Sequence, residues 1–79
     1  MRQVVLYTRP GCHLCDDTKR QLNIAANKLG FSVNEINIED DPALRIRYSQ
    51  DVPVVTVQGQ EAFRHCFDGV KLRKLLTTN

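Results

Sequence analysis

The 79-residue sequence predicts an α/β fold in which a four-stranded mixed sheet and three helices follow the order β-α-β-α-β-β-α. Two observations carry this prediction. In the first half, short β-rich segments alternate with helical periodicity, which is typical of parallel strands joined by crossover helices. In the second half, two β-rich segments flank Gln58-Gly59, a pair typical of a hairpin between antiparallel strands. No repeat or low-complexity tract interrupts the chain, so we expect one domain over residues 1–79.

The first strand and the helix after it have the clearest pattern. Residues 4–8 form a β-rich, mostly apolar run, and the turn pair Pro10-Gly11 ends it. From Cys12 onward the spacing changes to three or four, as on one stripe of an amphipathic helix. The residues of this stripe are Leu14, Thr18, Leu22, Ala25 and Leu29. Charged residues suit the dipole of this helix at its first and last turns: Asp16, Asp17 and Lys28. Gly30 is placed to end it.

Three further strands are expected, over residues 32–38, over 54–57 and from the hairpin turn through Phe67. Two further helices are expected, one over 42–48 and one after Asp68. Asp41 can cap the second helix, with Pro42 at its first position. Asp68 can cap the last helix, which is expected to bury Val70, Leu72, Leu75 and Leu76.

Composition and charge exclude several classes of function. The apolar fraction of 42% and the net charge of +2, with acids and bases interspersed, indicate a globular domain without a nucleic-acid or membrane partner. The apolar run at 4–7 is too short for a signal peptide or a membrane span, so we expect a cytoplasmic protein, and a monomer. Three cysteines, an odd number, argue against a secreted disulfide scaffold.

Cys12 and Cys15 form a C-x-x-C pair where a strand turns into a helix. A thiolate there faces unpaired backbone N–H groups and the positive end of the helix dipole, and C-x-x-C thiols at such positions ionise more readily than free cysteine. A protonated His13 would add to this effect, whereas the carboxylates of Asp16 and Asp17 oppose it. The balance of these charges stays open at this point.

Position then assigns different roles to the two cysteines. Cys12, at the edge of the helix, is expected to be the more exposed sulfur and the attacking nucleophile, and Cys15 to resolve the mixed disulfide. Val52-Pro53 directly precedes a predicted strand and is a candidate for a cis peptide bond. We expect it to face the cysteine turn and to leave backbone groups free for an incoming peptide or thiol compound. The alternative is a proline that only starts a strand.

A zinc site is the main rival for these cysteines, with His65 and Cys66 as further ligands. Adjacent residues of a strand point to opposite faces, so at most one of these two could join the pair. We therefore expect no metal site, and we interpret Cys66 as a small core or edge residue rather than a third redox thiol.

The segment Tyr7-Thr8-Arg9-Pro10-Gly11-Cys12-His13-Leu14-Cys15 is similar to the glutaredoxin opening, a strand followed by Lys/Arg-Pro-Gly-Cys-x-x-Cys. Val52-Pro53 matches the last two positions of the Thr-Val-Pro segment of that family. With its element order, the sequence therefore resembles thioredoxin-fold proteins and, among them, the small glutaredoxin-like proteins. The resemblance implies a thioredoxin-like fold.

The resemblance also implies a substrate site. Arg9 would attract a glutathione carboxylate, and Val52 and Pro53 would supply a backbone cradle. His13 and Leu14 would flank the substrate, where glutaredoxins usually have a proline and an aromatic residue. This change should alter the reduction potential.

In that family a Gly-Gly-x-Asp turn binds the γ-glutamyl end of glutathione. The corresponding residues here are 67–70, which contain one glycine and an aspartate at a different position from that of the family. Glutathione is thus expected as a co-substrate at most, with no tightly bound cofactor. Glutathione, a thioredoxin reductase and a dedicated partner all stay open as electron donors.

These features predict a thiol–disulfide oxidoreductase of glutaredoxin-like type that acts on a disulfide-containing protein or a small thiol compound. The alternatives are a redox-sensing or binding module with little turnover and a small metal carrier.

Overall fold

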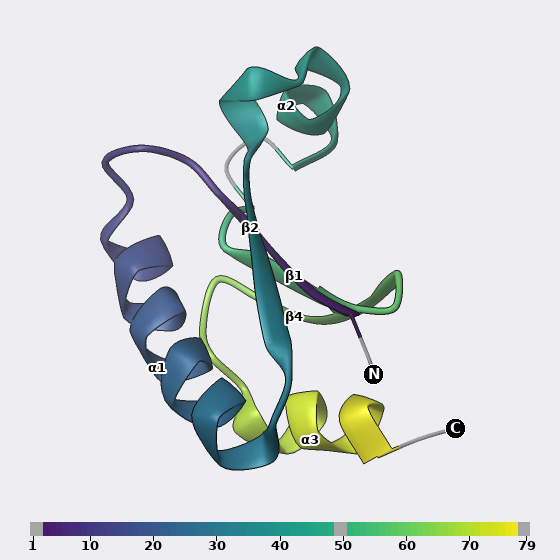
Figure 1. Ribbon diagram of the computed structural model, residues 1–79. Helices are drawn as coiled ribbons and strands as arrows, with labels where there is room; N and C mark the ends of the chain where they lie inside the picture. The colour runs from purple at the N-terminus through teal and green to yellow at the C-terminus, as the bar shows by residue number, and fades with distance from the viewer. Residues whose placement is uncertain (1–2, 49–50, 78–79) are drawn as a thin grey trace.

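The computed structural model describes residues 3–48 and 51–77, and its elements follow the predicted order (Figure 1). They are β1 (Gln3–Thr8), α1 (His13–Leu29), β2 (Ser32–Asn37), the short 3-10 helix η1 (Ile38–Asp40), α2 (Pro42–Tyr48), β3 (Val54–Val57), β4 (Gln60–Arg64) and α3 (Gly69–Thr77). The α/β fold with three helices and a four-stranded mixed sheet is therefore confirmed. None of the described helices is long and apolar enough to cross a membrane.

The strands lie side by side in the order β2-β1-β3-β4. β1 runs parallel to β2, whereas β3 is antiparallel to both β1 and β4. The start of β3 therefore lies at the edge of the sheet where β1 ends, and Tyr7 pairs there with Val54. This topology brings the segment before β3, which contains Pro53, to the edge from which the chain enters the cysteine turn.

One face of the sheet carries the main apolar core. Leu6 of β1 pairs with Val55 of β3, so their side chains share this face. The buried cluster on this face takes residues from β1, β3 and β4, from α1 and α3, and from the end of the turn after α1. Its members are Val4, Leu6, Leu22, Phe31, Val55, Val57, Ala62, Phe63 and Leu72. Since α1 and α3 both contribute, both helices cover this face.

A second, smaller cluster involves the opposite face, next to α2, which Figure 1 shows at the far end of the molecule from α3. Its buried members are Cys15, Ile38, Tyr48, Val52 and Val54. The rings of Tyr7 and Tyr48 lie against each other, with centroids 4.7 Å apart. The cysteine turn thus borders a packed apolar cluster.

Helix α1 begins and ends as predicted, but its buried stripe is displaced by one residue at the start. Gly30, at φ 76°, ends the helix in the left-handed conformation, and its N–H donates to the Ala26 carbonyl at 2.8 Å. The buried residues are Cys15, Thr18 and Leu22. Leu14 and Leu29, predicted on this stripe, are 49% and 45% exposed. The prediction was wrong at Leu14 because the neighbouring Cys15 behaves as a small apolar residue and is buried in its place, and it was also wrong at Leu29, in the last turn of the helix.

The segment after β4 also differs from the prediction. β4 ends at Arg64 rather than Phe67, and His65 adopts a left-handed φ of 72° that takes the chain out of the sheet. Cys66 was interpreted as a small core or edge residue; it is exposed, so it is not a core residue. Residues 67–70 lie at the start of α3, and the turn after β4 begins at His65.

The caps of α2 and α3 are confirmed, but of the four residues expected to be buried in α3 only Leu72 is fully buried, while Leu75 and Leu76 are partly buried. The Asp68 carboxylate accepts the Lys71 N–H at 3.1 Å, and the Asp41 carboxylate accepts the Ala43 N–H at 2.9 Å. Leu72 is buried, whereas Val70 is 82% exposed. Two residues are about 200° apart around a helix, so Val70 points away from the row that Leu72 begins.

Candidate active site

Cys12 is the N-cap of α1, and its sulfur lies at the positive end of the helix. Its Sγ accepts the backbone N–H of Cys15 at 3.2 Å, and its carbonyl accepts the N–H of Asp16 at 3.2 Å. Gly11, at φ 74°, provides the left-handed turn that carries the chain from β1 to this cap. The Cys12 side chain is half-buried. A thiolate at this sulfur keeps a backbone donor and faces the helix dipole, and both stabilise its charge.

Cys15 lies one turn further along α1 and is only 3% exposed. Burial raises the pKa of its thiol to about 12. The hydrogen bond with Cys12 and the negative charges of Cys12 and Asp16 act in the same direction, while a backbone hydrogen bond at Arg9 opposes them. At neutral pH Cys15 is therefore a protonated thiol beside the Cys12 sulfur. The two cysteines differ in exposure in the predicted sense.

The peptide bond between Val52 and Pro53 is cis, as the sequence analysis predicted. Val52 is 4% exposed and belongs to the same apolar cluster as Cys15, and Cys12 packs against this cluster. In the part of the chain that the structure describes, the backbone of Val52 makes no hydrogen bond. The structure thus brings both cysteines together with Val52, whose N–H and C=O have no hydrogen-bond partner among residues 3–48 and 51–77.

The sequence did not predict a cluster of polar contacts next to this segment. We call it the charged corner; its members are Asp51, Glu61, Arg64 and His65. The His65 N–H donates to the Pro53 carbonyl at 2.8 Å, and His65 Nε2 lies 3.4 Å from Asp51 Oδ1. Arg64 Nη1 lies 3.0 Å from Asp51 Oδ2. Two further nitrogens of Arg64 donate to the carboxylate of Glu61, at 2.8 and 2.6 Å, which lowers the pKa of that carboxyl. The end of β4 is therefore joined to the cis-proline turn by one backbone hydrogen bond, the Arg64–Asp51 ion pair and the contact between His65 and Asp51.

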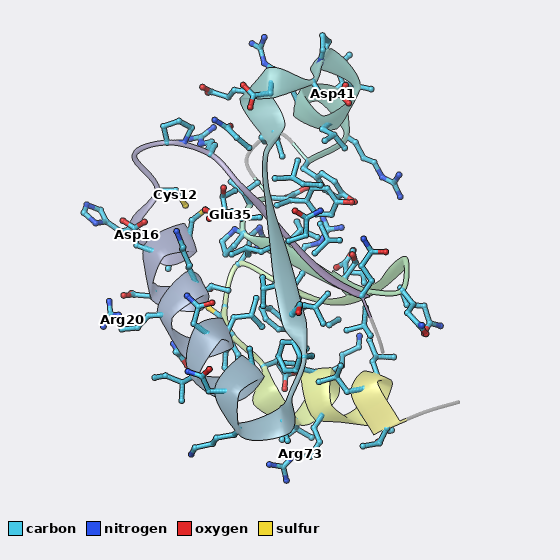
Figure 2. The ribbon with its side chains drawn as sticks, viewed as in Figure 1. Cys12, Asp16, Arg20, Glu35, Asp41 and Arg73 are labelled. Atoms are coloured by element: carbon cyan, nitrogen blue, oxygen red, sulfur yellow. The ribbon has the colours of Figure 1, made fainter. Side chains whose placement is uncertain are left out.

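The other predicted substrate residues surround the cysteine turn. His13 and Leu14 are exposed in the first turn of α1, and Arg9 is exposed just after β1. Figure 2 shows Cys12 and Asp16 at the amino end of α1, with Glu35 of β2 across from them.

Arg9 lies between two open cavities. One, of about 380 Å³, also has Cys15 and three carboxylates in its wall: Asp16, Glu35 and Asp40. The other, of about 440 Å³, lies toward α2 and includes Arg45 and Ile46.

Within residues 3–48 and 51–77, no group of three or more His, Cys, Asp or Glu side chains is placed to hold a metal ion. His65 and Cys66 lie in the turn after β4 rather than in a strand, so the strand alternation used to separate them does not apply. Both are exposed.

The topology and the dithiol at the start of α1 define a thioredoxin-fold protein of glutaredoxin-like type. The family model of the glutaredoxin-like domain (DUF836) matches residues 3–77, and the chain belongs to this family. The resemblance read from the sequence is thereby confirmed.

Individual relatives agree with this assignment. The uncharacterized protein Rv0508 of Mycobacterium tuberculosis is 34% identical over 64 residues, which cover 75% of this chain and 66% of that protein, so the match spans just under two thirds of the relative's length. The solution structure of protein Ne2328 from Nitrosomonas europaea matches with a TM-score of 0.83 at 29% identity, over 92% of this chain and 88% of that one. Glutaredoxin 1 from Francisella tularensis shares the fold, with a TM-score of 0.58 at 21% identity over 99% and 100% of the two chains.

Proposed function

We propose that this protein is a thiol–disulfide oxidoreductase in which Cys12 attacks a substrate disulfide and Cys15 resolves the intermediate. The observation that carries the proposal is the inequality of the two sulfurs. Cys12 is half-buried and accepts a backbone N–H at the start of α1, whereas Cys15 is a buried thiol with a raised pKa. A nucleophile needs access and a stabilised negative charge, and only Cys12 has both.

The reaction would proceed in two exchanges. The Cys12 thiolate attacks one sulfur of the substrate disulfide, a Cys12–substrate disulfide forms, and the other substrate sulfur leaves and takes a proton from solvent. Cys15 then attacks Cys12 Sγ and closes a disulfide between the two cysteines. The Cys15 proton passes to the second substrate sulfur as it leaves. The substrate gains two electrons from the cysteine pair, one proton from Cys15 and one proton from solvent.

The raised pKa of Cys15 fits this order of events. Before attack, the charge of Cys12 and the hydrogen bond between the two thiols help to hold the proton on Cys15. Formation of the mixed disulfide removes the charge on Cys12, so one cause of the raised pKa disappears at the moment when Cys15 must react. Burial still opposes ionisation of the Cys15 thiol in the mixed disulfide.

The substrate would lie along Val52. The N–H and C=O of this residue, which have no partner among the described residues, would offer two hydrogen bonds to an extended peptide, as in strand addition. The exposed side chains of His13 and Leu14 would contact the residues next to the substrate sulfur. We therefore propose a disulfide-containing peptide or protein as substrate, with small disulfides as simpler alternatives.

Two electrons from a thiol donor would regenerate the dithiol. The candidates are two molecules of glutathione, for which Arg9 would attract a carboxylate, and a dithiol protein such as a thioredoxin reductase. Three carboxylates share the cavity beside Arg9 and lower its attraction for an anion on that side. The dithiol donor is therefore the better match to the charges of the site.

Reduction of insulin by dithiothreitol tests the proposal. The wild-type protein should accelerate the reaction, Cys12→Ser should abolish the acceleration, and Cys66→Ser, the matched cysteine control, should keep it. Unchanged acceleration by Cys12→Ser, or none by the wild-type protein, would overturn the proposal. Replacing dithiothreitol by glutathione, or by NADPH with a thioredoxin reductase, then distinguishes the donors.

A further inference from the structure

A cavity of about 910 Å³ lies away from the cysteines, in a groove between α1 and α3. Five large apolar side chains are exposed in the part of the molecule that the structure describes, and three of them line this groove. Ile24 is 52% exposed, Leu29 is 45% exposed and Val70 is 82% exposed. Apolar residues scattered singly over a surface need no explanation, but their concentration in one groove indicates an interaction site.

The floor of the groove is preformed by core residues. Phe67 lines it, and its ring packs edge-on against Phe63 of the main core, with centroids 5.4 Å apart. Leu72, also in the lining, is 1% exposed. A partner would therefore meet a fixed apolar surface and would not have to order it, which reduces the entropy lost on binding.

The rim of the groove has one sign of charge. Its lining includes Lys28, Arg73 and Lys74 but no acidic residue. No carboxylate in the lining offsets the charge of these three basic groups. The last nine residues of α1 and the whole of α3 contain no Asp or Glu. An acidic partner therefore meets no like charge along either wall.

The groove is separate from the dithiol. Cys12 lies at the amino end of α1, and Arg73 lies beyond the other end of that helix (Figure 2). Ile24 follows Cys15 by nine residues of the same helix, which corresponds to about 14 Å along its axis. A molecule in the groove could thus be held while Cys12 stays open to a disulfide.

We infer that this groove binds an acidic amphipathic helix of a partner protein. A helix lying between two others presents apolar residues at i, i+3 or i+4 and i+7 to the floor, and its flanking positions face the rim. Apolar anchors would contact Ile24, Leu29 and Val70, while Glu or Asp side chains at the flanks would pair with Lys28 and Arg73. Helix α3 spans nine residues, so a partner helix of about three turns matches the length of the groove. This docking surface goes beyond the proposed thiol–disulfide exchange and does not depend on it.

The test uses two synthetic peptides of about 14 residues with the same leucines at helical spacing, one with glutamates and one with lysines on the flanks. Each is titrated into the ¹⁵N-labelled full chain, and amide shifts and affinity are measured. We expect the glutamate peptide to shift the amide signals of residues 21–29 and 67–77. The lysine peptide should bind at least about tenfold more weakly than the glutamate peptide. Affinity should fall as salt rises from about 0.05 to 0.5 M.

Two exposed apolar residues, Val70 in the groove and Ile46 on α2, give a matched pair of variants. Val70→Asp should weaken the glutamate peptide by about tenfold or more, because it places a carboxylate in the groove. Ile46→Asp, at a side chain that is 84% exposed on α2, should leave the affinity within about twofold. Arg73→Glu should weaken the glutamate peptide and strengthen the lysine peptide.

Three results would overturn the inference. They are equal binding of both peptides, shifts outside the groove, and no effect of Val70→Asp. Concentration-dependent dimerisation of the free chain through the same amides would also overturn it, because the occupant would then be a second copy.

Discussion

The difference between the two cysteines predicts a large difference in their alkylation. Iodoacetamide reacts with thiolates, so the rate at Cys15 depends on the fraction that is ionised. The pKa of Cys15 rises from an ordinary value of 9.0 to about 12, which lowers this fraction by about 1,000-fold at neutral pH. The intrinsic nucleophilicity of a thiolate increases with its pKa, with a Brønsted coefficient of about 0.4–0.5, and recovers about 15- to 30-fold of this loss.

The net expectation is that Cys15 in the folded chain reacts at least about 30-fold more slowly than Cys15 in the unfolded chain. Its exposure of 3% slows it further, because the reagent must reach the sulfur. Cys12 is half-buried and should be alkylated well before Cys15.

The assay is quenched alkylation of the reduced protein at about pH 7.5, with each cysteine followed by peptide mass, in buffer and in about 6 M guanidinium chloride. Cys66, which is exposed, reports in the same sample that the reagent is active. Alkylation of Cys15 at the same rate in the folded and unfolded chains, or ahead of Cys12, would refute the reasoning.

Three further predictions concern stability and the charged corner. First, the folded chain keeps the Cys15 proton between pH 9.0 and about 12 while the unfolded chain loses it. The free energy of unfolding should therefore fall as pH rises through this window, by up to about 1.4 kcal/mol per pH unit, and urea denaturation of reduced Cys15→Ala should lack this contribution. Second, Leu22→Ala should lower the free energy of unfolding by about 2–5 kcal/mol, because Leu22 is fully buried, against about 0.5 kcal/mol for the exposed Leu29; equal losses in urea denaturation would contradict the assigned stripe. Third, Asp51→Ala should slow insulin reduction about two- to fivefold while it changes stability by about 1 kcal/mol or less, because both its partners are partly exposed; an unchanged rate would mean that the corner does not position Val52.

The parts of the fold that the sequence predicted correctly rest on local signals. The turn Pro10-Gly11, the left-handed Gly30 and the cap at Asp68 each follow from the backbone preferences of a few neighbouring residues. The order of strands and helices follows from these local signals together with the spacing of apolar residues. The cysteine pair and the cis-proline segment meet at one edge of the sheet because β3 is antiparallel to β1, whereas the hairpin pattern predicted only that β3 is antiparallel to β4.

The charged corner could not be predicted because it depends on the register of the hairpin. The turn at 58–59 pairs Val57 with Gln60, and simple counting from there places Phe63 opposite Val54. A register shift between Val55 and Thr56 moves Arg64 into that position instead. This shift brings Arg64 and His65 to Asp51, and no local sequence signal marks it.

The wrong assignments of buried residues have a different cause. Helical spacing admits Leu14 and Cys15 almost equally at the start of α1, and the larger apolar residue was preferred. Packing against the sheet selects Cys15, which leaves Leu14 exposed beside the reactive sulfur. In α3, the row that faces the core begins at Leu72, and this leaves Val70 in the groove.

The central claim, attack by Cys12 and resolution by Cys15, is tested most directly by trapping the intermediate. Reduced Cys15→Ser is mixed with insulin, quenched with acid, and analysed by intact mass and peptide mapping, with Cys12→Ser treated in parallel. The account predicts a stable mixed disulfide between insulin and Cys12 in Cys15→Ser, and none at Cys15 in Cys12→Ser within the same time. An adduct on the exposed Cys66 alone, or equal adducts in both variants, would contradict it.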